Sequence, residues 1–155
     1  MKGDTKSIEY LNGVLRNELT AMDQYFIHSR MYEDWGLNEL YERLHHEMQE
    51  ESEHATKLIQ RILFLEGAPN LKERDPLNVG TDVPGMLKND LELEYRVIAT
   101  LKEVIAQCEA AKDFETREIL EDLLQDTEED HTWWLEQQLG LINKIGLNNY
   151  LQSKM

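Results

Sequence analysis

Apolar residues recur every three or four positions along four long stretches of the chain, with charged residues between them. A repeat of this period places the apolar side chains on one face of an α-helix, whereas a β-strand would alternate every second residue. The pattern therefore predicts four long amphipathic helices and one short helix near the end of the chain, over residues 5–34, 37–65, 83–111, 114–144 and 147–152.

The breaks between these segments are few, and one of them is long. Gly36 separates the first two segments, Asp113 is placed to cap the fourth, and Gly146 precedes the short tail. The stretch 67–84 is rich in Gly, Pro and Asn and is long enough to run the length of a bundle, so the second and third helices can be parallel. We expect one all-α domain over residues 1–155: a four-helix bundle with a long crossover between helices 2 and 3 and a short C-terminal fifth helix.

Each apolar stripe is interrupted near its middle by a glutamate. A buried carboxylate is costly unless it is paired, protonated or bound to a metal ion. In the second and fourth segments a histidine follows three residues later, and on a helix these two side chains are neighbours on one face. The chain thus has two helix pairs, each offering Glu and then Glu-x-x-His, through Glu18, Glu51, His54, Glu94, Glu128 and His131.

A single Glu-x-x-His motif is weak support for a metal site in a chain so rich in glutamate. Glu42 and His45 form another such pair, but His45 lies two residues before Glu47 and so points about 200° away from the buried stripe. The other two pairs pass this test and lie in register with glutamates on the two remaining stripes. Agreement across four helices favours a metal site over surface charge.

Four carboxylates and two imidazoles suit two iron or manganese ions. Hard carboxylates stabilise ferric iron more than ferrous iron, and two adjacent irons can together pass two electrons to O₂ or peroxide. We expect Glu51 and Glu128, each beside a histidine, to bridge the two ions. The terminal ligands are then Glu18 and Glu94, with one histidine on each ion, His54 and His131.

Composition limits the partners of this 155-residue chain. Acidic residues outnumber basic residues 31 to 16, for a formal net charge of −15, so the surface repels nucleic acid and attracts cations. Cys108 is the one cysteine, which excludes an internal disulfide and fits a reducing compartment. The N-terminus shows no signal peptide, and no apolar run is long enough to cross a bilayer. We expect a soluble, cytoplasmic protein with neither a nucleic-acid nor a membrane partner.

The chain resembles the bacterioferritin family at these six residues and in longer stretches: MKGDTKSIEYLN, NEL, DQYFIHSRMYEDWGL, RILFLEGAPNL and GLNNYLQ. The resemblance covers essentially the whole chain. It implies a ferritin-like fold, a hollow homo-oligomeric shell of 24 subunits, oxidation of Fe(II) by O₂ or H₂O₂, and storage of a ferric mineral. The six residues match the family's ferroxidase ligands one by one, so the resemblance also implies a di-iron centre of two iron ions per subunit.

The resemblance extends to residues outside the six ligands. Tyr25 matches a tyrosine that supplies an electron, although its place on the first stripe also fits a simple core residue. His46 and Glu50 match an iron site on the inner surface, although an i, i+4 pair is usually a solvated face. Asn149 and Gln152 match polar residues that line fourfold pores. The family also implies a ferredoxin as reductant for iron release.

One position departs from the family. Bacterioferritins hold haem between two subunits through a methionine directly after the second-helix ferroxidase glutamate, and here that position is Ser52. A serine hydroxyl is a poor ligand for haem iron. Met48, one turn earlier, is more simply interpreted as a packing residue. We therefore expect little or no haem in the homomer, and haem only in a mixed shell with a haem-binding bacterioferritin subunit.

Three functions compete at this stage: iron storage with ferroxidase activity, another di-metal carboxylate oxidoreductase of the peroxidase or catalase type, and a non-catalytic shell subunit. The complete ligand set argues against the third. The lack of a Cys-x-x-Cys motif argues against a rubrerythrin-like peroxidase.

Residues outside the metal constellation are assigned to packing and to interfaces. His28 and His45 fit no cluster, and we interpret them as structural. Three aromatic residues are expected to be exposed at subunit interfaces: Tyr32, Trp35 and Tyr150.

Overall fold

Six α-helices and one short π-helix make up the regular structure of the chain, and the computed structural model describes every residue from 1 to 155. No β-strand is present. The elements are α1 (Thr5–Asp34), α2 (Asn38–Phe64), α3 (Val83–Ala110), α4 (Phe114–Asp126), η1 (Thr127–Thr132), α5 (Trp133–Ile145) and α6 (Leu147–Ser153). These bounds agree with the predicted segments to within one residue, except that the π-helix η1 interrupts the fourth predicted helix.

Local signals in the sequence account for where the helices begin and end. Asp82 caps α3, its carboxylate accepting a hydrogen bond of 2.8 Å from the backbone N–H of Gly85. Asp113 caps α4 as predicted, by accepting a hydrogen bond of 3.2 Å from the backbone N–H of Thr116. Gly146 has a φ of 83° between α5 and α6, a left-handed conformation that glycine adopts without strain.

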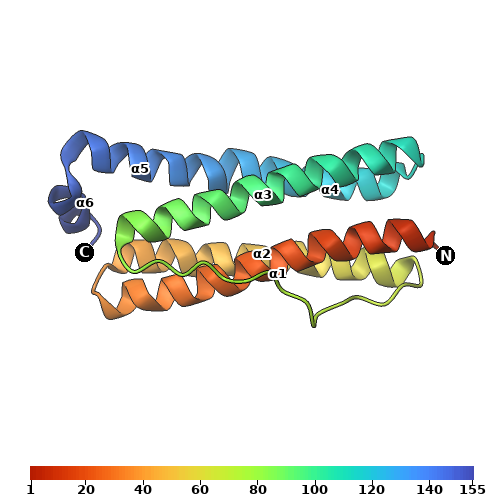
Figure 1. The fold of residues 1–155 in the computed structure, drawn as a ribbon, viewed down its shortest axis with the longest axis horizontal. Helices are drawn as coiled ribbons and strands as arrows, with labels where there is room; N and C mark the ends of the chain where they lie inside the picture. Colours follow the sequence, from red (N-terminus) through yellow and green to blue (C-terminus); the bar gives the residue numbers. More distant parts are fainter.

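Figure 1 shows two helical hairpins packed side by side. The first consists of α1 and α2, and the second consists of α3 and the continuous run α4–η1–α5. The connection between α2 and α3 returns along the bundle, so these two helices are parallel, as predicted. The core lies between the helices, because α1 packs against α2 and α3, and α3 packs against α4, η1 and α5. The short α6 folds across the end of the bundle.

A buried polar network fastens the long connection to the bundle. The Asp90 carboxylate on α3 accepts hydrogen bonds from Gln24 Nε2 and His28 Nδ1 on α1, each at 2.8 Å. His28 Nε2 in turn accepts from the backbone N–H of Gly80 at 3.1 Å, and Gln24 Oε1 accepts from that of Asn78 at 3.1 Å. The network fixes the connection against α1 and gives His28 the structural role expected from the sequence.

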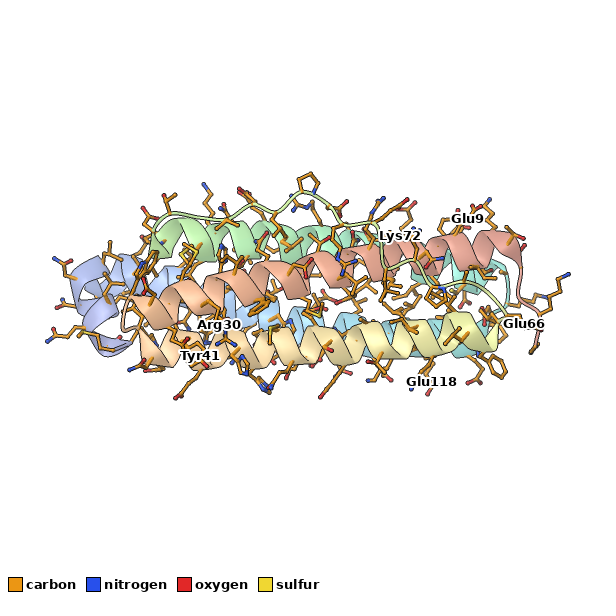
Figure 2. All side chains as sticks on the ribbon, turned by 90° about the horizontal axis from the view of Figure 1, so that it is seen from below. Glu9, Arg30, Tyr41, Glu66, Lys72 and Glu118 are labelled. Carbon is orange, nitrogen blue, oxygen red and sulfur yellow. The ribbon has the colours of Figure 1, made fainter.

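Charged side chains cover the outside of the bundle, as the amphipathic pattern requires. Figure 2 shows Glu9 and Glu118 on the surface, and both are exposed. The predicted exposure of two aromatic residues is wrong, because Tyr32 and Tyr150 are fully buried within the chain. Tyr150 lies on α6, which folds back so that the Tyr150 hydroxyl donates to Gln138 Oε1 at 2.7 Å. None of the helices combines the length and the apolar character needed to cross a membrane.

Candidate metal centre

Five buried side chains meet at the middle of the bundle. They come from α1, α2, α3 and η1, and all are nearly inaccessible to solvent. The apolar stripes turn them inward, because a helix repeats its face every three or four residues. They are five of the six residues predicted as metal ligands: Glu18, Glu51, His54, Glu94 and His131.

The carboxylate of Glu51 lies between the two imidazoles. On one side, His54 Nδ1 is 3.6 Å from Glu51 Oε2 and 3.3 Å from Glu18 Oε2. On the other side, His131 Nδ1 is 3.0 Å from Glu51 Oε1 and 3.9 Å from Glu94 Oε1. The two rings are stacked, with centroids 5.9 Å apart and an angle of 14° between their planes. The centre therefore has two half-sites that share Glu51: Glu18–Glu51–His54 and Glu51–Glu94–His131.

The donor atoms of this centre are poorly satisfied by the protein alone. One oxygen each of Glu18, Glu51 and Glu94 is buried without a hydrogen-bond partner, and so is His131 Nδ1. Unpaired polar groups in a dry interior are unfavourable. A cation at each half-site would satisfy them, and carboxylate oxygen with imidazole nitrogen is a donor set that suits iron or manganese. The residues present therefore fit two metal ions.

Protons stabilise the metal-free centre. Burial and the neighbouring charge of Glu51 raise the pKa of Glu18 to about 8. Burial by itself would lower the pKa of His54, but hydrogen bonds to Glu18 and Glu51 raise it to about 11. Both groups are therefore protonated at neutral pH, and a metal ion must displace these protons in order to bind.

The sixth predicted ligand, Glu128, is not part of this cluster. Its side chain is 43% exposed, and its Oε2 lies 3.9 Å from Lys102 Nζ. The sequence analysis assumed an α-helix, in which Glu128, three residues before His131, would lie on the same face as His131. Residues 127–132 instead form a π-helix, whose turn is wider, so residues three apart no longer share a face. Thr127, four residues before His131, is the buried residue instead. The predicted inward position of Glu128 is therefore wrong, and its role as a second bridging carboxylate stays a prediction.

A carboxylate behind each histidine orients its ring. His54 Nε2 lies 2.7 Å from Asp126 Oδ2, and His131 Nε2 lies 2.6 Å from Glu50 Oε2. The hydrogen bond to His131 lowers the pKa of Glu50 to about 2, so this partner is ionised. With Nε2 held outward in both rings, Nδ1 is left facing Glu51 and the half-sites. Such outer partners commonly fix the orientation of metal-binding imidazoles.

The outer partners of the histidines were not all predicted. Asp126 lies off the buried stripe and meets His54 only through the fold, so no periodicity marks it. Glu47, in contrast, occupies an apolar position of the second stripe and is buried, with Oε2 2.5 Å from His131 Nε2. Its place on that stripe was the signal that could have identified it.

We expect Asp126→Ala to weaken divalent metal binding at the His54 half-site by about 10- to 100-fold, because the outer carboxylate keeps the ligand imidazole oriented and basic. Calorimetric titration of the metal-free protein with Zn(II) measures this loss. Asp122→Ala is the matched control, since Asp122 is an exposed aspartate one turn earlier on α4. Equal affinities of the two variants would contradict the role of Asp126.

Tyr25 borders the centre. Its hydroxyl donates a hydrogen bond to Glu94 Oε1 at 2.6 Å, and its ring meets that of His131 edge-on, with centroids 6.3 Å apart. Burial and the charge of Glu94 raise the pKa of Tyr25 well above its usual value, so the phenol keeps its proton. The position fits both a core residue and an electron donor beside the metals.

Of the remaining predicted residues, Glu50 is half-buried and the others are exposed. His46 and Glu50 form the expected pair, with His46 Nε2 2.7 Å from Glu50 Oε1. Ser52 is exposed on α2. Asn149 and Gln152 are exposed on α6. Among these residues, Glu50 alone also contacts a residue of the buried centre.

Comparisons with known proteins place the chain among relatives of the same length. Residues 8–145 match the family model described as the ferritin-like domain. A protein named bacterial ferritin from Synechocystis sp. is 59% identical over 155 residues, covering 100% of this chain and 99% of the relative. Bacterial ferritin from Pseudomonas aeruginosa is also 59% identical, over 100% of both chains. A bacterioferritin from Rhodobacter capsulatus is 44% identical over 94% of this chain and 90% of the relative.

A four-helix bundle with carboxylates and imidazoles gathered around one shared glutamate has the architecture of the metal-binding carboxylate proteins, with two groups that could each hold an ion. The sequence matches are more specific: the chain belongs to the ferritin family, whose members store iron. The family predicted from the sequence is thereby confirmed. The names of the relatives give no support to a peroxidase or catalase on the same bundle.

Proposed function

We propose that this chain oxidises Fe(II) to Fe(III) at the buried cluster of five side chains around Glu51, called the Glu51 centre below. We propose further that it stores the product as a ferric mineral inside a shell of 24 copies. The observation that most directly supports this is the convergence of two half-sites on Glu51. Carboxylates favour ferric over ferrous iron because they are hard, anionic ligands. Two ferrous ions held side by side can together deliver two electrons to one molecule of O₂ or H₂O₂.

The roles of the ligand residues follow from the half-sites. Glu51 lies where it can bridge the two ions, with one oxygen toward each histidine. Glu18 and His54 complete one half-site, and Glu94 and His131 complete the other. Each histidine presents Nδ1 to its ion, because its Nε2 is held by an outer carboxylate.

Tyr25 is proposed both to orient Glu94 and to supply an additional electron. The hydrogen bond of 2.6 Å from its hydroxyl fixes one oxygen of Glu94. The same hydrogen bond gives the phenolic proton an acceptor when the ring loses an electron. The edge-on contact with His131 brings the ring close to the second half-site.

The shell, its partners and its location belong to the same proposal. The full-length similarity to bacterial ferritins supports a homo-oligomer, or a mixed shell with a haem-binding subunit, in the cytoplasm. In such a shell α6 would surround the fourfold axes, with Asn149 and Gln152 lining the pores. His46 and Glu50 would hold iron on the inner surface, and a ferredoxin would reduce stored iron for release.

Aerobic loading with Fe(II) tests the proposed function. The purified protein is mixed with Fe(II) in air, its size is measured by light scattering, and its retained iron is measured by elemental analysis. We expect a closed particle of roughly 24 chains that retains far more iron than its metal centres alone could hold. A monomer or dimer at neutral pH that retains only the ions of its centre would contradict storage.

Ser52 leads to a prediction about haem. A homomeric shell should purify without haem even when haem is abundant, because Ser52 is exposed on α2 and its hydroxyl is a poor ligand for haem iron. Ser52→Met should show a Soret band, since two methionines across a twofold axis form a symmetric pair of axial ligands. Thr56→Met, at an exposed position one turn later on α2, is the control that should not.

The opposite result is easy to recognise by absorption spectroscopy. A strong Soret band from the unchanged homomer, at roughly one haem per two chains, would contradict the prediction. Met48, half-buried one turn before Ser52, would then be the first residue to replace.

A further inference from the structure

Arg43 connects α2 to the segment that carries His131. Its Nε donates to Glu47 Oε1 on the same helix at 2.5 Å, and its Nη2 donates to Asp130 Oδ1 on η1 at 2.8 Å. The guanidinium also lies over the ring of Trp134 on α5, 4.7 Å from the ring centroid. Asp130 precedes His131 and Trp134 follows it, so one arginine contacts the chain on both sides of this ligand.

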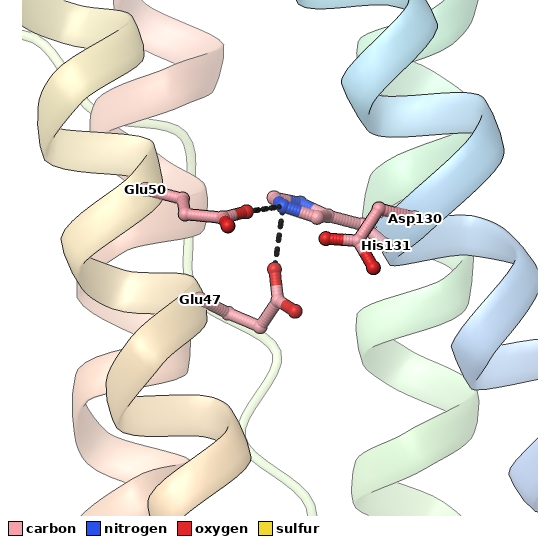
Figure 3. A group of neighbouring side chains, drawn as sticks. All are labelled: Glu47, Glu50, Asp130 and His131. Atoms are coloured by element: carbon pink, nitrogen blue, oxygen red, sulfur yellow. Dashed lines mark hydrogen bonds and ion pairs between the residues drawn. The ribbon is translucent and has the colours of Figure 1, made fainter.

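Glu47 relays the contact from Arg43 to the imidazole. Glu47 is 2% exposed, its Oε1 accepts from Arg43, and its Oε2 lies 2.5 Å from His131 Nε2. Figure 3 shows Glu47 extending from α2 toward the imidazole, with Asp130 beside His131. A buried carboxylate that loses its paired cation is strongly destabilised. Arg43 therefore fixes the place of Glu47 and, through it, the outer edge of the imidazole ring.

The two ligand histidines differ in how the backbone holds them. His54 lies within α2, a regular helix whose backbone hydrogen bonds fix its position. His131 lies in η1, a π-helix with a wider turn, which is a rare conformation found mostly at functional sites. The place of His131 therefore depends more on contacts with other helices, and Arg43 supplies such a contact from α2.

We propose that Arg43 is a positioning residue, which holds His131 with Nδ1 directed into its half-site and so sets the metal affinity of that half-site. The two carboxylates that pair with Arg43 belong to neither half-site of the Glu51 centre. A guanidinium has no acceptor atom and cannot bind a metal ion itself. The proposal rests on the proposed function, because it requires that the Glu51 centre binds metal ions.

The contacts of Arg43 require a guanidinium. Its planar group can donate to two carboxylates and lie over an aromatic ring at the same time, whereas a lysine ammonium is a compact point charge. The Arg43 side chain is 26% exposed, so its ion pairs are partly shielded from water and from salt. Charge alone should therefore not replace Arg43.

Co(II) binding to the metal-free, assembled protein tests the proposal without redox chemistry, because Co(II) accepts imidazole and carboxylate ligands. His54→Ala isolates the half-site of His131. In this background Arg43→Gln should weaken Co(II) binding by about 10- to 100-fold and change the visible absorption of the bound ion. His131→Ala isolates the other half-site, where Arg43→Gln should change the affinity by less than about twofold.

Arg61→Gln is the matched control. Arg61 also lies on α2 and ties it to α4, through Nε to Thr116 Oγ1 at 2.8 Å and Nη2 to Asp113 Oδ1 at 3.2 Å. It also lies over an aromatic ring, that of Phe64, at 5.0 Å. Its loss removes the same charge and the same kind of tie between helices, away from the Glu51 centre. Co(II) affinity should stay unchanged in both backgrounds.

Two further variants separate position from charge. Asp130→Ala, which removes the more exposed partner of Arg43, should weaken Co(II) binding at the half-site of His131 and add nothing to Arg43→Gln. Arg43→Lys should weaken the same half-site, because its ammonium cannot hold both carboxylates.

Three results would overturn the positioning role of Arg43. They are unchanged affinity in Arg43→Gln at the half-site of His131, equal weakening of both half-sites, and full affinity in Arg43→Lys. The second would indicate a general loosening of the bundle, and the third would show that charge suffices. Failure of the unchanged protein to bind Co(II) would instead overturn the proposed metal centre, and the role of Arg43 with it.

Discussion

Replacing Glu51 with alanine is expected to abolish the fast oxidation of Fe(II), slowing it by at least about 100-fold. Glu51 is the one carboxylate beside both histidines, through Oε2 to His54 and through Oε1 to His131. Its loss removes a ligand from both half-sites, whereas Glu18→Ala removes a ligand from one. The fold should survive, because removing one of several crowded, buried carboxylates relieves repulsion. Stopped-flow absorbance after mixing with Fe(II) in air measures the rate.

Two neighbouring glutamates provide matched controls for Glu51→Ala. Glu53→Ala changes an exposed glutamate two residues later on α2 and should leave the fast phase intact. Glu128→Ala should change the rate by less than about twofold, because the Glu128 side chain is exposed and paired with Lys102. Slow oxidation in Glu128→Ala would show that this side chain turns inward when iron binds. Unchanged fast oxidation in Glu51→Ala would contradict the assigned centre itself.

Asp90→Ala is expected to lower the free energy of unfolding by about 2–6 kcal/mol, because each buried donor left without an acceptor costs about 1–3 kcal/mol. Asp90 is fully buried and accepts hydrogen bonds from both Gln24 and His28. Its loss leaves two buried donors without an acceptor and loosens the connection that these residues anchor. Calorimetry should show a fall of about 10 °C in the midpoint of thermal unfolding.

A neighbouring residue is the control for Asp90→Ala. Asn89 also links α3 to the long connection, through an exposed hydrogen bond of 3.1 Å from Nδ2 to the carbonyl of Asn78. Asn89→Ala should cost only about 0.5–1.5 kcal/mol. Asp90→Asn should recover much of the loss, because the amide oxygen can still accept from His28. A midpoint in Asp90→Ala no lower than in Asn89→Ala would show that the buried network does not stabilise the fold.

The bundle could be predicted from the sequence because its helices are long and their apolar stripes are regular. Leu40, Leu44 and Leu58 repeat on one face of α2, and all three are completely buried. The length of the connection then allows α2 and α3 to be parallel. The same regularity places Glu51 and His54 inside the bundle, where a carboxylate and an imidazole need a partner.

Other features could not be predicted, because they depend on local departures from the α-helix or on contacts between distant segments. The π-helix shifts the inward face of the fourth helical run, so that Thr127 and not Glu128 precedes His131 on that face. Asp126 follows no hydrophobic period, and it reaches His54 only when α4 and α2 pack together.

The most direct test of the di-iron centre is the amplitude of the fast oxidation phase as Fe(II) is added in steps to the metal-free protein in air. Two half-sites share Glu51 in each chain, so each chain should oxidise two ferrous ions rapidly. We expect the amplitude to rise linearly and to stop rising at two Fe(II) per chain, with slower oxidation beyond that point. An amplitude that saturates at one Fe(II) per chain, or the absence of any fast phase, would contradict a di-iron centre at Glu51.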